Sequence, residues 1–340
     1  MTDRRFVATA PGPRRIRRAI TDLVDRELPA RELLDVVQAR LRMVVPFTRG
    51  GWWTTDPETL LPTELWDFDM SVIEREIRAD HGVALESEPR SSAAGSELRF
   101  IAPHGGHALG AACWTRTKND PPFSHAEIAY ITEVAREVGG ALRADLLRLA
   151  MRSSPANLQA AAARPGTLLL SEGDRVEGCS SEARSWLERL GVADPLGPLP
   201  ATLRWISLQA RTHAASAPSA GLTPARSHLP TPGGELILVR AEALEGPYPH
   251  RVVMTLESAT ASGLFPLLVV LYGLSEREQT VARLVVEGLP LDDIAATLSL
   301  SPFTVRDHVK SLYVKVGVRS RPELTARLGT LGTVSAASGM

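Results

Sequence analysis

Residues 274–328 read LSEREQTVARLVVEGLPLDDIAATLSLSPFTVRDHVKSLYVKVGVRSRPELTARL and contain the strongest fold signals in the chain. Ser275 with Glu278 three positions later forms a capping box, a pattern that begins many helices. Ser301 followed by Pro302 is a second helix start, because proline is tolerated at the first helical position. Further residues that start or end helices follow at short intervals: Gly288, Gly317 and Ser320. The spacing predicts four short helices.

The third of these helices has two chemically different faces. One apolar stripe recurs at i, i+4, i+7 and i+11 and must face a core: Val305, Val309, Leu312 and Val316. The residues pointing away from that stripe are Arg306 and Lys310, with Phe303, Asp307 and Val314 beside them. The turn before the helix, Ser299-Leu300, is short enough for a helix–turn–helix arrangement.

Basic residues are concentrated in this region although the whole chain is nearly neutral. The 340 residues have a formal net charge of −1, so the chain as a whole is not a polycation. Only three lysines occur, Lys118, Lys310 and Lys315, and two of them lie in the third helix. Residues 301–327 contain six basic and two acidic residues. This local excess of positive charge indicates a nucleic-acid surface.

On these motifs the segment resembles the DNA-binding domain of the LuxR family. The resemblance implies a four-helix fold whose third helix enters the major groove and whose fourth helix forms dimers. Carried over by position, the residues expected to face bases are Arg306, Asp307 and Lys310. Those expected to contact phosphates are Ser301, Thr304 and Lys315.

One stretch departs from the family pattern, at the start of the second helix. The family often has Ser-Asn-Lys-Glu there, whereas this chain has Pro290-Leu291-Asp292-Asp293. A capping hydroxyl and a phosphate-facing lysine are therefore absent. Aspartates suit the positive end of a helix dipole, but we expect Asp292 to repel DNA and weaken binding.

The upstream region predicts two further domains, so the fold class is multidomain α+β. Residues 1–150 resemble a GAF domain in element order, in the long final helix starting at Ser124, and in Trp52-Trp53 and Asp56-Pro57. Residues 151–165 are a predicted linker, and 166–265 resemble a PAS-like domain. The helix–turn–helix domain is expected over 266–330, and a flexible tail over 331–340.

Alternating and helical patterns place the elements of these two domains. In the first, strands are predicted over 44–55, 60–69, 98–103 and 107–115, and helices over 70–80 and 124–149. In the second, strands are predicted over 167–171, 175–177, 226–230, 235–242 and 251–257, and helices over 181–190 and 200–213. Gly105-Gly106 between two apolar strands indicates a hairpin turn.

We find no catalytic or metal-binding constellation in the sequence. His104 and His107 bracket a predicted turn, and Cys113 lies in an apolar strand, so we interpret them as a turn and a core residue. A Gly-x-Ser-x-Gly nucleophile motif and a P-loop are both absent. The apolar run 264–274 is too short to cross a bilayer. No enzyme activity, cofactor, metal or membrane partner is expected, and the predicted location is the cytoplasm.

The sequence thus predicts a transcriptional regulator that couples a small-molecule or partner signal to DNA binding. Its expected partners are double-stranded DNA, an unknown effector, a second copy in a homodimer and RNA polymerase. Trp52 and Trp53 are the candidate effector-binding residues, because adjacent indoles on one strand suit an apolar or aromatic ligand. Two alternatives stay open: an enzyme in the first 260 residues, or an assembly protein whose helix–turn–helix binds only protein. Pro290 and Asp292 support the second alternative.

Overall fold

The computed structural model describes residues 12–66, 89–92, 95–153, 164–215, 225–246 and 250–328. The chain divides into two compact units. The first comprises Met1–Thr54 and Leu65–Asp145, and the second Thr55–Glu64 and Leu146–Met340. The connection 55–64 therefore belongs to the second unit, although strands on both sides of it belong to a sheet of the first. The helix predicted over 70–80 lies outside the described residues.

The first unit is built on a five-stranded sheet in the order β2-β1-β5-β4-β3. Its strands are β1 Arg49–Thr55, β2 Pro62–Trp66, β3 Pro89–Ser92, β4 Gly95–His104 and β5 His107–Thr117. The predicted hairpin is confirmed: β4 and β5 pair antiparallel, with Gly105 and Gly106 both at positive φ in the turn. β1 begins five residues later than predicted. The reason is that the N–H groups of Val44 and Val45 bond back to the Leu41 carbonyl and prolong the preceding helix turn.

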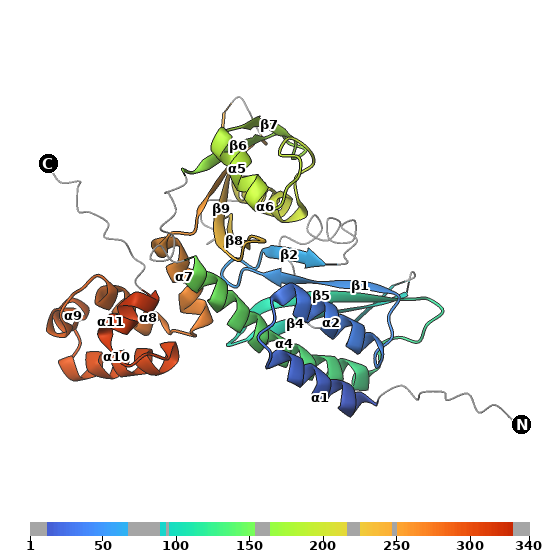
Figure 1. The fold of residues 1–340 in the computed structure, drawn as a ribbon, viewed down its shortest axis with the longest axis horizontal. Helices are drawn as coiled ribbons and strands as arrows, with labels where there is room; N and C mark the ends of the chain where they lie inside the picture. The colour runs from blue at the N-terminus through green and yellow to red at the C-terminus, as the bar shows by residue number, and fades with distance from the viewer. Residues whose placement is uncertain are drawn as a thin grey trace, which may run out of the picture. The chain divides into compact units, whose positions relative to one another are not determined.

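Three helices lie on one face of this sheet: α1 Pro13–Val24, α2 Ala30–Arg42 and α4 His125–Arg152 (Figure 1). The helix expected from Ser124 is confirmed and runs three residues beyond its predicted end. Gly139 lets α4 approach the sheet closely, since a Cβ there would lie 2.2 Å from the Pro103 carbonyl oxygen. Ile131 and Leu142 on α4 are buried in the core.

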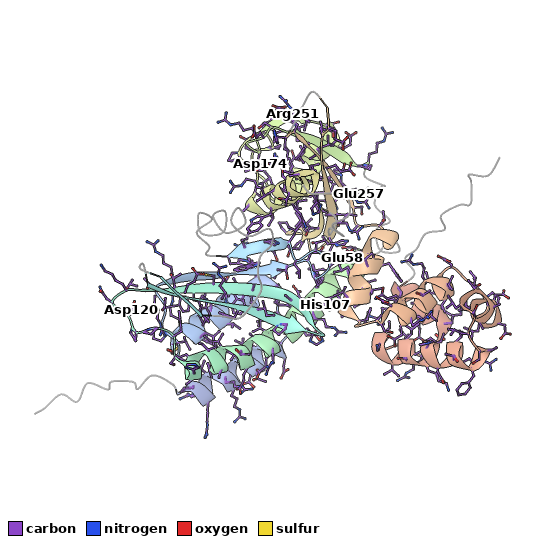
Figure 2. All side chains as sticks on the ribbon, turned by 180° about the vertical axis from the view of Figure 1, so that it is seen from behind. Glu58, His107, Asp120, Asp174, Arg251 and Glu257 are labelled. Atoms are coloured by element: carbon purple, nitrogen blue, oxygen red, sulfur yellow. The ribbon has the colours of Figure 1, made fainter. Side chains whose placement is uncertain are left out.

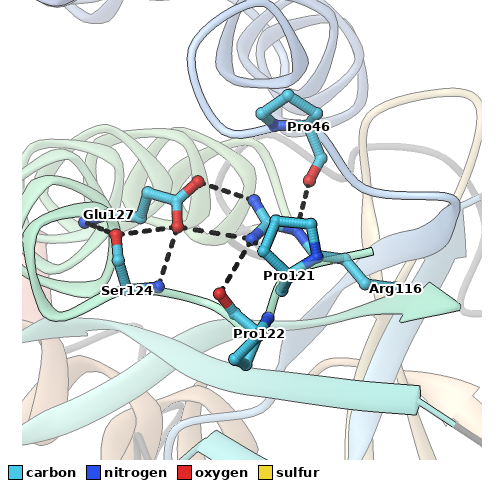
Figure 3. Close-up of polar contacts among 6 residues, drawn as sticks. All are labelled: Pro46, Arg116, Pro121, Pro122, Ser124 and Glu127. Carbon is cyan, nitrogen blue, oxygen red and sulfur yellow. Dashed lines mark hydrogen bonds and ion pairs between the residues drawn. The ribbon is translucent and has the colours of Figure 1, made fainter. Parts of the chain in front are cut away.

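Arg116 on β5 fixes the start of α4 (Figure 3). Its guanidinium donates to Glu127 at 2.6 Å and to the carbonyl oxygens of Pro46 and Pro121 at 2.7 and 3.1 Å. Glu127 also accepts from the backbone N–H and the hydroxyl of Ser124, both at 2.8 Å. Burial raises the pKa of Glu127, but the bonds from Arg116 and Ser124 outweigh it and leave that pKa lowered. The predicted cap is thus also the anchor of a buried cation.

The second unit contains a five-stranded antiparallel sheet in the order β7-β6-β10-β9-β8. Its strands are β6 Gly166–Leu170, β7 Val176–Cys179, β8 Arg226–Pro230, β9 Leu236–Ala243 and β10 Val252–Ser258. Helices α5 Ser181–Arg189 and α6 Ala201–Ala215 pack on it. Asp174, labelled in Figure 2, accepts from Ser207 and Arg211 of α6 at 2.7 and 2.8 Å. The predicted order of two strands, two helices and three strands is confirmed.

The remainder of the second unit is helical. It comprises α7 Ala261–Leu271, α8 Glu276–Val286, α9 Leu291–Leu298, α10 Pro302–Val316 and α11 Arg321–Leu328. The four short helices predicted from residues 274–328 are therefore confirmed as α8 to α11. α7 begins at the Thr260 cap, before residue 266 where the helix–turn–helix domain was expected to start, and it contains Pro266. Among the described residues no helix combines the length and apolar character that a membrane span requires.

Candidate nucleic-acid interface

The start of α10 is held by hydrogen bonds of the cap predicted from the sequence. Ser301 Oγ accepts from the Thr304 N–H at 3.1 Å and lies 2.8 Å from the Thr304 hydroxyl. Ser299 ends α9 in the left-handed conformation with φ of 53°, which turns the chain sharply toward α10. α9 and α10 are therefore joined by a three-residue turn, as a helix–turn–helix requires.

The two predicted faces of α10 are confirmed. The stripe formed by Val305, Val309, Leu312 and Val316 is buried against the rest of this helical region. The opposite stripe consists of Phe303, Arg306, Asp307, Lys310 and Val314, all exposed. Phe303 and Val314 expose 70% and 82% of their surface, unusually much for such apolar side chains. This stripe is the side of α10 that is available to a partner.

The three side chains expected to face bases all lie on the exposed stripe. Lys310 Nζ is 3.9 Å from Asp307 Oδ1, and both side chains are more than half exposed. A surface pair at this separation contributes at most about 1 kcal/mol, so it orients Lys310 without immobilising it. Arg306 and Lys310 are one helical turn apart and present two positive charges in one direction.

Lys315 has a structural role that sequence reasoning missed. Its Nζ donates to Glu278 Oε2 at 2.6 Å and to the Gly273 carbonyl at 2.9 Å, and Ser311 donates to Glu278 Oε1 at 2.6 Å. Burial raises the pKa of Glu278, but these bonds outweigh it and lower the pKa to about 2. Lys315 therefore ties α10 to α8. The signal in the sequence was Glu278 itself, which was assigned only to the capping box.

The start of α9 lacks a capping side chain and contains two aspartates, as expected from the sequence. Pro290 occupies the cap position without a side-chain hydrogen bond to the helix. Asp292 and Asp293 stand exposed in the first turn, where their charges favour the helix dipole. The negative charge expected at this edge is therefore at the surface.

Trp52 and Trp53 lie on opposite faces of the first sheet. Trp52 is 1% exposed and packs edge-on to Phe100 and Trp114, with centroid distances of 5.0 and 6.4 Å. Trp53 packs on the other face with Ala111 and Cys113. The structure thus places the two candidate effector residues in separate clusters.

A further cluster was missed entirely, because its members are far apart in the chain. Asp56, Glu58 and His228 lie within 4.8 Å of one another through their polar atoms. Asp56 and Glu58 lie in the connection between β1 and β2, and His228 lies in β8. Local patterns could not have brought residues 172 positions apart together. His104 and His107 pair across the hairpin turn, as the turn interpretation predicted.

Residues 273–328 match a family model described as "Bacterial regulatory proteins, luxR family". A curated relative from Mycobacterium bovis, named "Putative HTH-type transcriptional regulator Mb0914c", is 42% identical over 62 residues. That alignment covers 18% of this chain and 7% of the relative. A second relative, from Aeromonas salmonicida and named "Putative HTH-type transcriptional regulator in exeN 3'region", is 45% identical over 51 residues. This alignment covers 15% of this chain and 26% of the relative.

The family model matches only the C-terminal helices, and the chain spans only a small part of the length of these relatives. A solved structure titled "Crystal structure of the phage VqmA-DPO complex" aligns with 50% of this chain and 84% of its own. Its sequence identity is 16% and its TM-score is 0.22, a value too low to support an argument about the fold.

Proposed function

We propose, on the premise that residues 273–328 form a helix–turn–helix domain of the LuxR family, that this chain is a sequence-specific DNA-binding transcription regulator. The observation that carries the proposal is the exposed stripe of α10. One face of this helix is committed to the core, and the other presents Arg306 and Lys310 to solvent. A helix of this width fits the major groove of B-DNA.

Within that groove Arg306 and Lys310 read base edges. Arginine binds guanine through two acceptors, so a guanine is expected opposite Arg306. Thr304 and Ser301 at the start of α10 contact the phosphate backbone, and Lys315 remains a candidate for a weaker contact of the same kind. Its side chain is 35% exposed despite the bond to Glu278.

The test is the substitution Arg306→Ala in the full chain. An operator is first selected from random duplex DNA with the parent protein, and binding is then measured on every single-base variant. Loss of Arg306 should cost about 1–3 kcal/mol and relax discrimination at one position. Arg277→Ala, an exposed arginine of α8, is the matched control and should leave the base preference unchanged.

Two outcomes would contradict the proposal. If Arg306→Ala discriminated among all variants as the parent does, α10 would not be the reading helix. If no sequence were enriched at all, the chain would act as an assembly protein whose helix–turn–helix binds protein, the alternative that Pro290 and Asp292 favour. In either of these functions the chain acts by binding, and we assign no catalytic role to any residue.

The upstream residues act as sensor domains in this proposal, GAF-like before the linker and PAS-like after it. Support comes from Trp53, which packs with Ala111 and Cys113 in a small apolar cluster separate from that of Trp52. A small aromatic or apolar effector binding there would change indole fluorescence and raise the melting temperature. A ligand library and cell extract that change neither would contradict this assignment.

The DNA-bound species is proposed to be a homodimer, with RNA polymerase as a further partner. Two copies of α10 would face half-sites about 10 base pairs apart, so the operator should be nearly palindromic. On α4, the core uses Ile131 and Leu142, which leaves half-buried Ile128 and exposed Ala129 for a partner copy. α11 is the second candidate surface.

A further inference from the structure

His228 is a buried side chain with hydrogen bonds on both ring nitrogens. It lies in β8, is 1% exposed, and has Nδ1 at 2.9 Å from Asp56 Oδ2. Nε2 lies 3.0 Å from the carbonyl oxygen of Gly263, in the first turn of α7. The backbone N–H of His228 also donates to Asp56 Oδ2, at 2.8 Å. One residue therefore joins the β1–β2 connection to α7.

The partners determine the charge of the ring. The Gly263 carbonyl can only accept, so Nε2 must carry a proton. Asp56 accepts a backbone N–H on each carboxylate oxygen, from Glu58 on Oδ1 and from His228 on Oδ2, so it is an ionised acceptor as well. Burial raises the pKa of Asp56, but these hydrogen bonds and those of the ring outweigh it and leave that pKa lowered. Nδ1 must then carry a proton too. The ring is an imidazolium, and Asp56 is its buried counter-ion.

Two other interpretations of this cluster fit less well. A metal ion would need a free lone pair on His228, whereas both ring nitrogens already lie within hydrogen-bond distance of protein oxygens. The remaining acid, Glu58 (labelled in Figure 2), is paired with Arg226. A catalytic base would need access to substrate, and His228 has almost none. Arg226 and the His228 ring therefore provide the positive charges that balance Glu58 and Asp56.

The ring of His228 brings a charged group to the first turn of α7. Asp56 is held rigidly, since its oxygens also accept from Glu58 N–H at 2.9 Å and its main chain bonds twice to the turn at Leu60 and Leu61. The facing residue of β9 is apolar Leu238. α7 itself has no charged side chain. Among the residues that the structure describes, the charged groups close to His228 are Asp56, Glu58 and Arg226.

We propose that Asp56, His228 and the Gly263 carbonyl form a charge-dependent link through which a displacement of the β1–β2 connection is passed to α7. β1 and β2 belong to the sheet of the first unit, and α7 leads directly into α8. The link itself does not depend on the proposed function. Only its expected effect, control of the DNA-binding helices, rests on that function. Loss of one ring proton leaves a single donor, so one of the two contacts becomes a contact between two acceptors and opens.

The first measurement concerns the ring alone. The full chain is labelled with ¹⁵N-histidine, and the two ring nitrogens of His228 are assigned by comparison with His228→Gln. Both nitrogens should be protonated at pH 7 in the parent. A spectrum with one unprotonated nitrogen at that pH would overturn the proposal.

The second measurement concerns α7. Asp56→Asn removes the counter-ion and should increase hydrogen exchange in residues 261–271 at least about tenfold, while β9 stays protected. Asp174→Asn is the matched control, because Asp174 bonds Ser207 and Arg211 in the same unit and has no bond to α7. Equal exchange of α7 in the two variants would overturn the link. Neither measurement includes DNA, so failure of the proposed function would leave both results unaffected.

Discussion

Phe303 is the exposed residue of α10 whose chemistry differs most from its neighbours. It is 70% exposed on a stripe otherwise lined by Arg306, Asp307 and Lys310. Exposing an aromatic side chain to water does not stabilise the fold. In the major groove, however, such a side chain can contact the C5-methyl group of thymine. Under the proposed function, the stripe would offer both charged and apolar contacts to bases.

Phe303→Ala should remove a preference for thymine at one operator position. Replacing that thymine by uracil deletes the methyl group and should weaken the parent by about 1 kcal/mol. The same replacement should leave the Ala variant unaffected, because the contact is already lost. Binding titrations on the two duplexes check this. If the parent bound uracil and thymine operators equally at every position, Phe303 would not contact a thymine methyl.

Lys315 ties α10 to α8 and is also a proposed phosphate contact, so its structural role can be measured separately from DNA. Lys315→Met leaves the buried Glu278 carboxylate without its cation and should cost about 1–3 kcal/mol at pH 7. Urea-dependent hydrogen exchange of α8 in the full chain measures this. Lys310→Met, which removes an exposed lysine from the same helix, should change stability by less than about 0.5 kcal/mol.

The contribution of Glu278 to stability should decrease as the pH is lowered. The pKa of Glu278 is lowered from 4.5 to about 2, so its stabilising contribution is complete above 4.5 and is lost as the pH falls toward 2. In Lys315→Met that pH dependence should shrink, because the main charged partner is gone. A parent and a variant that lose stability in parallel between pH 5 and 2 would contradict the assigned role.

At the scale of elements, α4 depends on one buried arginine. Arg116 is 6% exposed and joins β5, the residues before β1 and the first turn of α4. Its guanidinium also lies 4.1 Å from the centre of the Phe123 ring. The guanidinium donates hydrogen bonds to several carbonyl and carboxylate oxygens at once, and a shorter side chain could not make all of these bonds.

Arg116→Met should cost about 1–3 kcal/mol, because it leaves half-buried Glu127 without its charged partner. The effect should be largest at the start of α4, and hydrogen exchange over residues 125–138 measures it. Arg136→Met on the exposed side of the same helix is the control. Unchanged protection in Arg116→Met would show that the apolar face of α4 suffices to hold it on the sheet.

At the scale of the whole molecule, assembly is the main prediction. We expect a dimer at micromolar concentration, since paired helix–turn–helix domains read two half-sites. Sedimentation of the full chain with and without the selected operator measures the oligomeric state. Arg306→Ala should still dimerise, which separates assembly from base reading. If the chain were a monomer in both conditions, the predicted dimer and the predicted palindromic operator would both be wrong.

Local sequence patterns were sufficient wherever neighbouring residues carry the signal. The valine stripe of α10 and the Ser301 cap predicted both the helix and its core-facing side. Gly105-Gly106 predicted the hairpin, because both residues adopt positive φ at little cost. Ser124 with Glu127 predicted the start of α4. These features depend on periodicity and backbone preference, which act within a few residues.

Partner choice between distant segments depended on the tertiary structure. The sequence identified Glu278 as a cap, but only the packing of α8 against α10 paired it with Lys315, 37 positions away. Likewise Asp56 was noted in the sequence only as part of the Asp56-Pro57 pair, and its pairing with His228 required the β1–β2 connection to fold with the second unit. Periodicity shows which side of an element is buried, and by itself determined the helices and their faces. Which buried groups meet is decided by the close approach of non-sequential elements, where an unpaired charge would be too costly to remain.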